Sequence, residues 1–289
     1  MDARADAAFT IIQATEDGAG RTGMSVNLCC PDSTKSCAAC CGLYNVSNGT
    51  RDALLEKLSR RTLLFQETER SVEALIRYQS TVRTLQPDVP LDPSIHVCEF
   101  TGFVDKARLT PGCLLHPTVA GNQGVDFRGL CHYGSMACKS FYCPAWEELR
   151  PDERDILLKL LDDWHLYGLV INDLDFVESL FALLRLHVSG DLSEPRLLTG
   201  PAAEVLKEML AWKVSWPWKG DSLIRTSRYF CKRASCLHES DDGAHITRLV
   251  AVLGSTFGID SSAEGAREFV EDALGRFAQS YFHEPYDAR

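Results

Sequence analysis

Several features that would indicate a membrane, secretion or a nucleic-acid partner are missing from this sequence. Its longest apolar stretches, such as LFALLRLHV at 180–188, are far shorter than the roughly 20 residues that cross a bilayer. Residues 1–24 contain no apolar segment of the kind that a secretory signal carries. A net charge of −10 disfavours nonspecific binding to a phosphate backbone. We therefore expect a cytoplasmic protein with no membrane or nucleic-acid partner, and leave open an unknown protein partner.

Motifs that would name a reaction are missing as well. The chain has no Walker-type phosphate loop, no G-x-G-x-x-G run and no Ser–His–Asp pattern. Apolar alternation typical of strands is weak throughout. The sequence alone therefore leaves open whether the protein is an enzyme, and it predicts little β-structure.

Cysteine is what the sequence has in excess. Ten of its twelve cysteines fall within residues 25–149. A chain of 289 residues with 45% apolar content can bury a core without disulfide bonds. Thiols also stay reduced in the cytoplasm. The cysteine density of this region, which is rich in Gly and Pro from 98 onward, therefore predicts a metal-binding site rather than a disulfide framework.

The spacing of the cysteines supports the same prediction. Cys37, Cys40 and Cys41 form C-x2-C-C, and a C-x2-C turn can aim two sulfurs at one ion. The adjacent side chains of Cys40 and Cys41 point to opposite sides of an extended backbone. Either one of them ligates while the other packs, or the pair serves two metals or a polynuclear cluster. Soft thiolate donors suit zinc, copper(I) and iron–sulfur clusters.

Four segments, SCAACCGLYN at 36–45, CEFTGF at 98–103, GCLLHP at 112–117 and ACKSFYCP at 137–144, together resemble the YkgJ-type cysteine-cluster family. That family is described as a zinc- or iron-chelating domain, and the resemblance extends over about residues 29–145. Carried over residue by residue, it implies eight metal ligands: Cys37, Cys40, Cys41, Cys98, Cys113, Cys131, Cys138 and Cys143.

Further ligands and functions stay open. Cys29, Cys30, His116 and His132 lie near the eight cysteines, and a C-terminal C-x4-C-x-H holds Cys231 and Cys236. The cofactor expected is an iron–sulfur cluster or zinc, and the many thiolates favour iron–sulfur. The leading interpretation is a metal-binding protein with a redox or structural role. One alternative is a metal-dependent enzyme, either an oxidoreductase or methylase-like, because flagellin lysine methylases have a similar cysteine-rich part. Another is a metal carrier.

The expected fold is mainly α. We predict a disordered leader at 1–24, with Met24 as an alternative start, and a cysteine-cluster metal-binding domain at 25–149. This second region is expected to be irregular, apart from one long helix at about 51–84 and a short hairpin. An acidic, bundle-like helical domain is expected at 150–289, where the net charge is −7 against −1 in residues 25–149. Its helix starts include Pro151, Asn172 or Asp173, and Pro201.

Overall fold

A computed structural model describes residues 27–192, 194–221, 242–258 and 264–283. These residues are mainly helical, as predicted, with 59% of them in helices and 3% in strands. Within the described ranges, no helix is both long and apolar enough to cross a membrane. The leader predicted at 1–24 lies outside the described residues.

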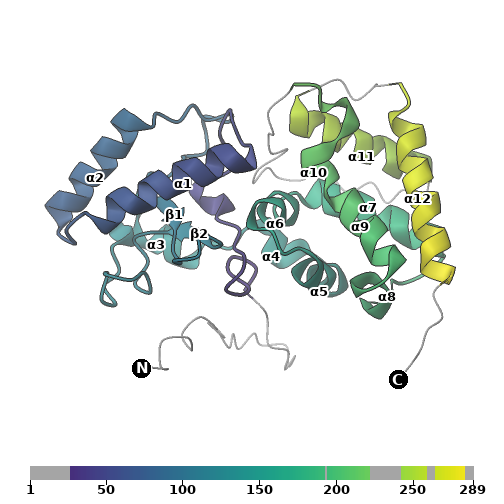
Figure 1. The fold of residues 1–289 in the computed structure, drawn as a ribbon, viewed down its shortest axis with the longest axis horizontal. Helices are drawn as coiled ribbons and strands as arrows, with labels where there is room; N and C mark the ends of the chain where they lie inside the picture. Colours follow the sequence, from purple (N-terminus) through teal and green to yellow (C-terminus); the bar gives the residue numbers. More distant parts are fainter. Residues whose placement is uncertain (1–26, 193, 222–241, 259–263, 284–289) are drawn as a thin grey trace.

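The cysteine-rich part combines two long helices with a small hairpin and several turns (Figure 1). Its helices and strands are α1 (Arg51–Gln66), α2 (Val72–Leu85), β1 (Thr101–Phe103), β2 (Pro111–Cys113) and α3 (Gly134–Ser140). Two 3-10 turns, η1 (Ala39–Cys41) and η2 (Arg128–Leu130), complete it. The predicted hairpin is confirmed, because β1 and β2 pair antiparallel with Thr101 opposite Cys113.

The single helix expected at 51–84 is wrong, since the chain breaks between α1 and α2. The guanidinium of Arg70 donates to the carbonyl of Phe65 at 2.7 Å and also bonds that of Thr68, so it holds the turn that follows α1. Ser71 then caps the next helix by accepting from the amide of Ala74. Apolar periodicity continues across the break and hides it.

Helices build almost all of the second half. They are α4 (Pro144–Glu148), α5 (Pro151–Leu160), α6 (Trp164–Ile171), α7 (Leu174–Val188), α8 (Glu194–Leu198), α9 (Pro201–Leu210), α10 (Trp212–Ser215), α11 (Asp242–Phe257) and α12 (Ala266–His283), with the 3-10 turn η3 (Pro217–Lys219). The starts predicted at Pro151, Asp173 and Pro201 are confirmed. The helical pattern that starts at Pro151 runs on through residue 171, but the chain breaks it into α5 and α6. Asp163 accepts from the amides of His165 and Leu166 at 3.0 Å and thereby begins a new helix.

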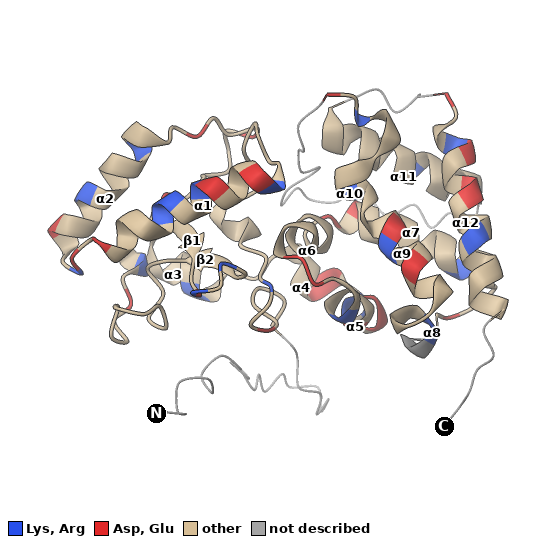
Figure 2. Cartoon of the chain, in the orientation of Figure 1, with Lys and Arg blue, Asp and Glu red and all other residues tan. Residues whose placement is uncertain are grey.

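Both acidic and basic positions occur on the helices of the helical half (Figure 2). On α9 and α12, for example, Glu208 takes a two-pronged ion pair from Arg276 at 2.9 Å. Arg267 pairs with Glu271 one turn further along α12. The acidic excess of this half is therefore spread over its outer faces, where each pair contributes little to stability.

The larger apolar cluster draws residues from both sides of the predicted boundary at 149/150. Tyr44, from the cysteine-rich part, packs so close to α6 that a Cβ on Gly168 would overlap its hydroxyl. Its hydroxyl donates to the carbonyl of Trp164 at 3.3 Å. The hydroxyl of Tyr167 donates to the carbonyl of Leu28 at 2.7 Å. The division into two domains stays a prediction, but α6 anchors the segment that leads into the cysteines.

Candidate metal centre

The cysteines that the sequence singles out come from separate segments of the chain and gather in one region. None of the ten cysteines within the described ranges forms a disulfide bond. Electrostatic contacts between thiols connect nine of them, which we group into two sets. Set one contains Cys29, Cys37, Cys40 and Cys143, and set two contains Cys41, Cys98, Cys113, Cys131 and Cys138. Cys40 also interacts with Cys41, Cys113 and Cys138, so it links the two sets. The sets adjoin at the Cys40–Cys41 doublet.

Set one is assembled by a tight turn and a helix start. The amide of Cys37 donates to the carbonyl of Cys29 at 3.0 Å, which brings these two segments together. Ala38 then adopts a left-handed conformation with φ 52°, and η1 carries Cys40 directly afterwards. Cys143 occupies the N-cap position of α4. The four thiols of set one are therefore brought together by the contact between the Cys29 and Cys37 segments, by η1 and by the start of α4.

Set two is assembled by the hairpin and by the segments that flank it. The amide of Cys98 donates to the carbonyl of Cys41 at 2.9 Å. The pairing of β1 with β2 then brings Cys113 back toward Cys98, across from Thr101. Cys131 and Cys138 lie with their sulfurs 3.1 Å apart, one before α3 and one within it. Cys98 and Cys131 are buried, while Cys138 is exposed.

Gly42 allows the doublet to approach Cys98. Its φ of 77° lies in the left-handed region that favours glycine. A Cβ here would also overlap the carbonyl of His96 and lie 2.8 Å from the Cα of Val97. The glycine after C-x2-C-C is therefore required both by backbone conformation and by the close passage of the 96–98 segment.

A recurring backbone arrangement surrounds four of the sulfurs. In each case, the amide two residues after a cysteine donates toward its sulfur, which favours the thiolate. The pairs are Cys37 with Ala39, Cys98 with Phe100, Cys113 with Leu115, and Cys143 with Ala145. Such amides stabilise negative charge on sulfur and are the kind of hydrogen bond that tunes metal–thiolate centres.

Burial and mutual repulsion act in the opposite direction. Burial raises the pKa of Cys29 to about 12, and the charges of Cys40 and Cys143 add to the shift. Burial likewise raises the pKa of Cys113 to about 12. The exception is Cys40, whose pKa is lowered because the thiol of Cys41 donates a hydrogen bond to it. A bound cation would remove the repulsion and deprotonate coordinating thiols.

The structure separates the residues that the sequence left open. Cys29 joins set one. The thiol of Cys30 instead lies 3.8 Å from the carbonyl of Asp32. This contact makes Cys30 a weaker candidate ligand than Cys29. The Nδ1 atom of His116 lies 2.7 Å from the hydroxyl of Thr118. Cys231 and Cys236 lie outside the described residues. The signal that could have selected Cys29 over Cys30 is weak, because both precede the same turn in the sequence.

His132 stacks on His96, with ring centroids 4.2 Å apart and planes inclined by 22°. The pair lies next to set two, because His132 follows Cys131 and His96 precedes Cys98 by two residues. Sequence reasoning missed His96.

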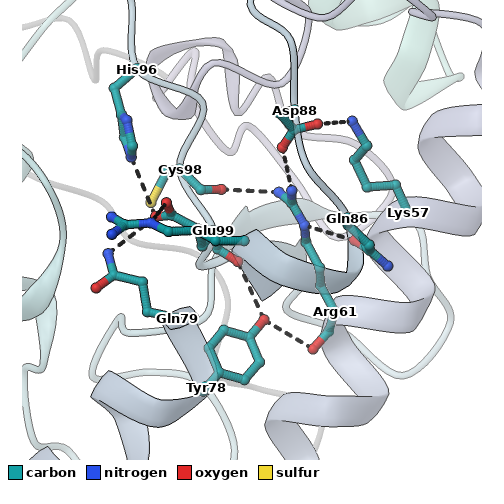
Figure 3. Close-up of polar contacts among 10 residues, drawn as sticks. Lys57, Arg61, Tyr78, Gln79, Gln86, Asp88, His96, Cys98 and Glu99 are labelled. Carbon is teal, nitrogen blue, oxygen red and sulfur yellow. Dashed lines mark hydrogen bonds and ion pairs between the residues drawn. The ribbon is translucent and has the colours of Figure 1, made fainter. Parts of the chain in front are cut away.

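A buried polar network fixes the carbonyl of Cys98 from the side of α1 (Figure 3). Arg61 donates to this carbonyl at 3.0 Å, to Gln86 at 3.1 Å, and pairs with Asp88. Tyr78 donates to the carbonyl of Glu99 at 3.3 Å. The residues on either side of the Cys98 sulfur are therefore held by α1 and α2.

The gathered thiols do not form a ready-made coordination shell. Among the residues that the model describes, no group of three or more His, Cys, Asp or Glu side chains is arranged to hold a metal ion. The donor chemistry nevertheless fits a thiophilic metal, since set one offers four thiols and set two offers five. No family model, curated protein or solved structure matches this chain.

Proposed function

We propose that this protein binds metal through its two sets of cysteines, with one centre in each set. Each centre is zinc or an iron–sulfur cluster, held by the thiolates of that set. In this proposal the irregular, cysteine-rich part is the metal-binding region, and the helical part is the scaffold that anchors it through α4 and α6. The eight cysteines predicted from the sequence are all included, and Cys29 is added to them.

The observation that carries the proposal is the gathering of nine cysteines from separate segments of the chain, none of them in a disulfide bond. Backbone amides beside Cys37, Cys98, Cys113 and Cys143 also lower the pKa values of these thiols, against the effect of burial. A neutral thiol is a weak acceptor and gains little from an aimed amide. A thiolate gains much more, because the hydrogen bond is charge-assisted. Crowded thiolates also need a cation, since their charges otherwise raise one another's pKa values. Donors aimed at sulfur, together with clustering, therefore support metal coordination over simple packing.

The division into two sets gives the cysteine doublet a role. Cys40 and Cys41 belong to different sets, and the hydrogen bond between their thiols places the doublet where the two sets meet. Four thiolates close the tetrahedral shell of a structural zinc and also hold a [2Fe–2S] or [4Fe–4S] cluster. Zinc would stabilise the fold, whereas an iron–sulfur cluster would carry electrons or act as a sensor. The number of thiolates favours iron–sulfur.

Elemental analysis and an absorption spectrum of anaerobically purified full-length protein test this proposal. We expect bound metal in two centres, with absorption at about 400 nm if they are iron–sulfur clusters and no visible colour if they are zinc. Protein that carries neither iron nor zinc after anaerobic purification, and takes up neither on reconstitution, would overturn the proposal.

Cys29 and Cys30 provide a matched pair of variants. They are adjacent in the chain, but Cys29 interacts with Cys40 and Cys143, whereas Cys30 interacts with Cys29 and with the carboxylates of Asp32 and Asp105. Cys29→Ser should lower the metal content, and Cys30→Ser should leave it unchanged. If Cys30→Ser lowers it and Cys29→Ser does not, the membership of set one is wrong.

A further inference from the structure

A pocket of about 360 Å³ lies beside set two and is not explained by metal binding. Its walls come from the C-terminal end of α2, from the loop at 87–97, and from Glu99 and His132. Glu99 follows Cys98 and His132 follows Cys131, so the pocket shares a wall with two of the proposed ligands. Its volume is at the lower end of the range of about 300–1,000 Å³ that is typical of small-molecule sites.

The polar groups of the pocket are arranged around a buried carboxylate. Glu99 is 5% exposed, and its oxygens accept from Gln79 at 3.1 Å, from His96 at 3.3 Å, and from Nε of Arg83. Because only Nε of Arg83 is used, the two terminal guanidinium nitrogens remain available. The side chain of Arg83 is 55% exposed and lines the pocket. Glu99 therefore orients an arginine whose forked end is free to bind a ligand.

Gln86 adds a second hydrogen-bond donor to the pocket. Its Oε1 accepts from Nε of Arg61 at 3.1 Å. The groups that Gln86 can still offer to a ligand are therefore N–H donors. The carboxylate of Asp88, which also lines the pocket, is paired with both Lys57 and Arg61 and is already neutralised.

Arg83 is the one Lys or Arg among the described residues that line the pocket, which also include the carboxylates of Asp88 and Glu99. Asp88 is paired with Lys57 and Arg61, which do not line the pocket, and Glu99 is paired with Arg83. The terminal nitrogens of Arg83 are therefore the cationic donors that the pocket offers, and they suit an anionic group on a ligand.

The other walls include aromatic rings and prolines. His96 and His132, whose rings stack on each other, both line the pocket. Pro87, Pro90 and Pro93 contribute rigid apolar surface to the loop. Such surfaces suit a planar ring better than a flexible aliphatic chain.

We infer that this pocket binds a small aromatic carboxylate, with the carboxylate on the terminal nitrogens of Arg83 and the ring against the His96–His132 pair. Arginine and carboxylate match as a two-pronged, charge-assisted pair. The inference does not depend on the metal, and it names a ligand class for a site that lies next to set two.

Titration calorimetry with benzoate, benzamide and acetate tests the inference on the full-length protein as purified. We expect benzoate to bind more tightly than benzamide, which lacks the charge, and more tightly than acetate, which lacks the ring. Arg83→Gln should weaken benzoate binding about tenfold or more, because the charged pair is lost. Arg77→Gln, on the exposed surface of the same helix and away from the pocket, should have no effect.

A second variant addresses the ring. His132→Ala should reduce the preference for benzoate over acetate, and the metal content of each variant is measured alongside to separate pocket effects from metal loss. Equal affinity for benzoate and benzamide, no benzoate binding to the wild type at millimolar concentration, or unchanged binding in Arg83→Gln would each overturn the inference. Benzoate binding by protein that carries no iron or zinc and takes up neither on reconstitution would support the inference while refuting the proposed metal function.

Discussion

Nη1 of Arg61 lies 3.0 Å from the backbone carbonyl of Cys98. Arg61 is 2% exposed and also bonds Gln86 and Asp88. One buried cation thus ties α1 to the residue before the hairpin and to the loop that lines the pocket. The position of Cys98 depends on a side chain that lies 37 residues away in the sequence.

Arg61→Leu should destabilise the protein and loosen set two. The change leaves the carbonyl of Cys98 without its donor and removes one of the two partners of Asp88, so a loss of about 3–5 kcal/mol is expected. Chemical denaturation and metal analysis measure the two effects. Arg60→Leu is the matched control, because Arg60 is exposed and pairs with Glu56 on the same helix. It should change stability by less than about 1 kcal/mol. Equal effects of the two substitutions would contradict the role given to Arg61.

Gly42→Ala should disturb set two more than a comparable glycine substitution elsewhere. Both Gly42 and Gly124 have positive φ, at 77° and 79°, so alanine at either position carries a backbone penalty of about 1–2 kcal/mol. Nothing lies within 4 Å of a Cβ at Gly124, whereas a Cβ at Gly42 meets the backbone of His96 and Val97. The difference in melting temperature and metal content between the two variants therefore isolates the close approach of Cys41 to Cys98. No difference would mean that this approach is unimportant.

The two sets should lose metal independently. Cys143→Ser leaves three thiols in set one, and the double change Cys98→Ser with Cys113→Ser leaves three in set two, so each variant should keep about half of the metal of the wild type. Elemental analysis per polypeptide measures this, and Cys30→Ser serves as the control with full content. Complete loss in either variant would indicate one polynuclear centre that includes both sets. Full retention in either would remove the substituted cysteines from the ligand assignment.

Local signals made part of this fold predictable. The helix starts at Pro151, Asp173 and Pro201 depend on residues within one turn, and the sequence identifies them correctly. The break between α1 and α2 was missed because Arg70 acts on the carbonyls of residues before it, which leaves no trace in apolar periodicity. Capping by Asp163 was missed for a similar reason, since the apolar residues of α6 continue the pattern of α5.

The sequence indicates that cysteines make up the site, but not how they divide into two sets. The C-x2-C-C motif and the later cysteines are visible in the sequence. Which thiol joins which set depends on the left-handed turn at Ala38 and on the passage of His96 beside Gly42. These are contacts between distant segments, and no local rule gives them. The pocket depends in the same way on how Arg83 meets Glu99.

Stability should fall in mildly acidic solution partly because of His165. This residue is 2% exposed, and its Nε2 donates to the carbonyl of Gly49 at 2.8 Å. Burial lowers its pKa, and Arg51 acts in the same direction, while the Gly49 hydrogen bond, Asp163 and Asp52 oppose the shift. Below about pH 6.5, the unfolded chain therefore binds a proton on this side chain, whereas the folded protein still keeps the side chain neutral. Stability from this group is present above that pH and is lost as pH falls toward the folded pKa.

Denaturation midpoints of wild type and His165→Gln are measured from pH 7.5 to 5.5. The midpoint of the variant should fall less steeply with decreasing pH than that of the wild type. His283→Gln, at the exposed end of α12, should keep the slope of the wild type. A slope in His165→Gln as steep as that of the wild type would assign the acid sensitivity to other groups.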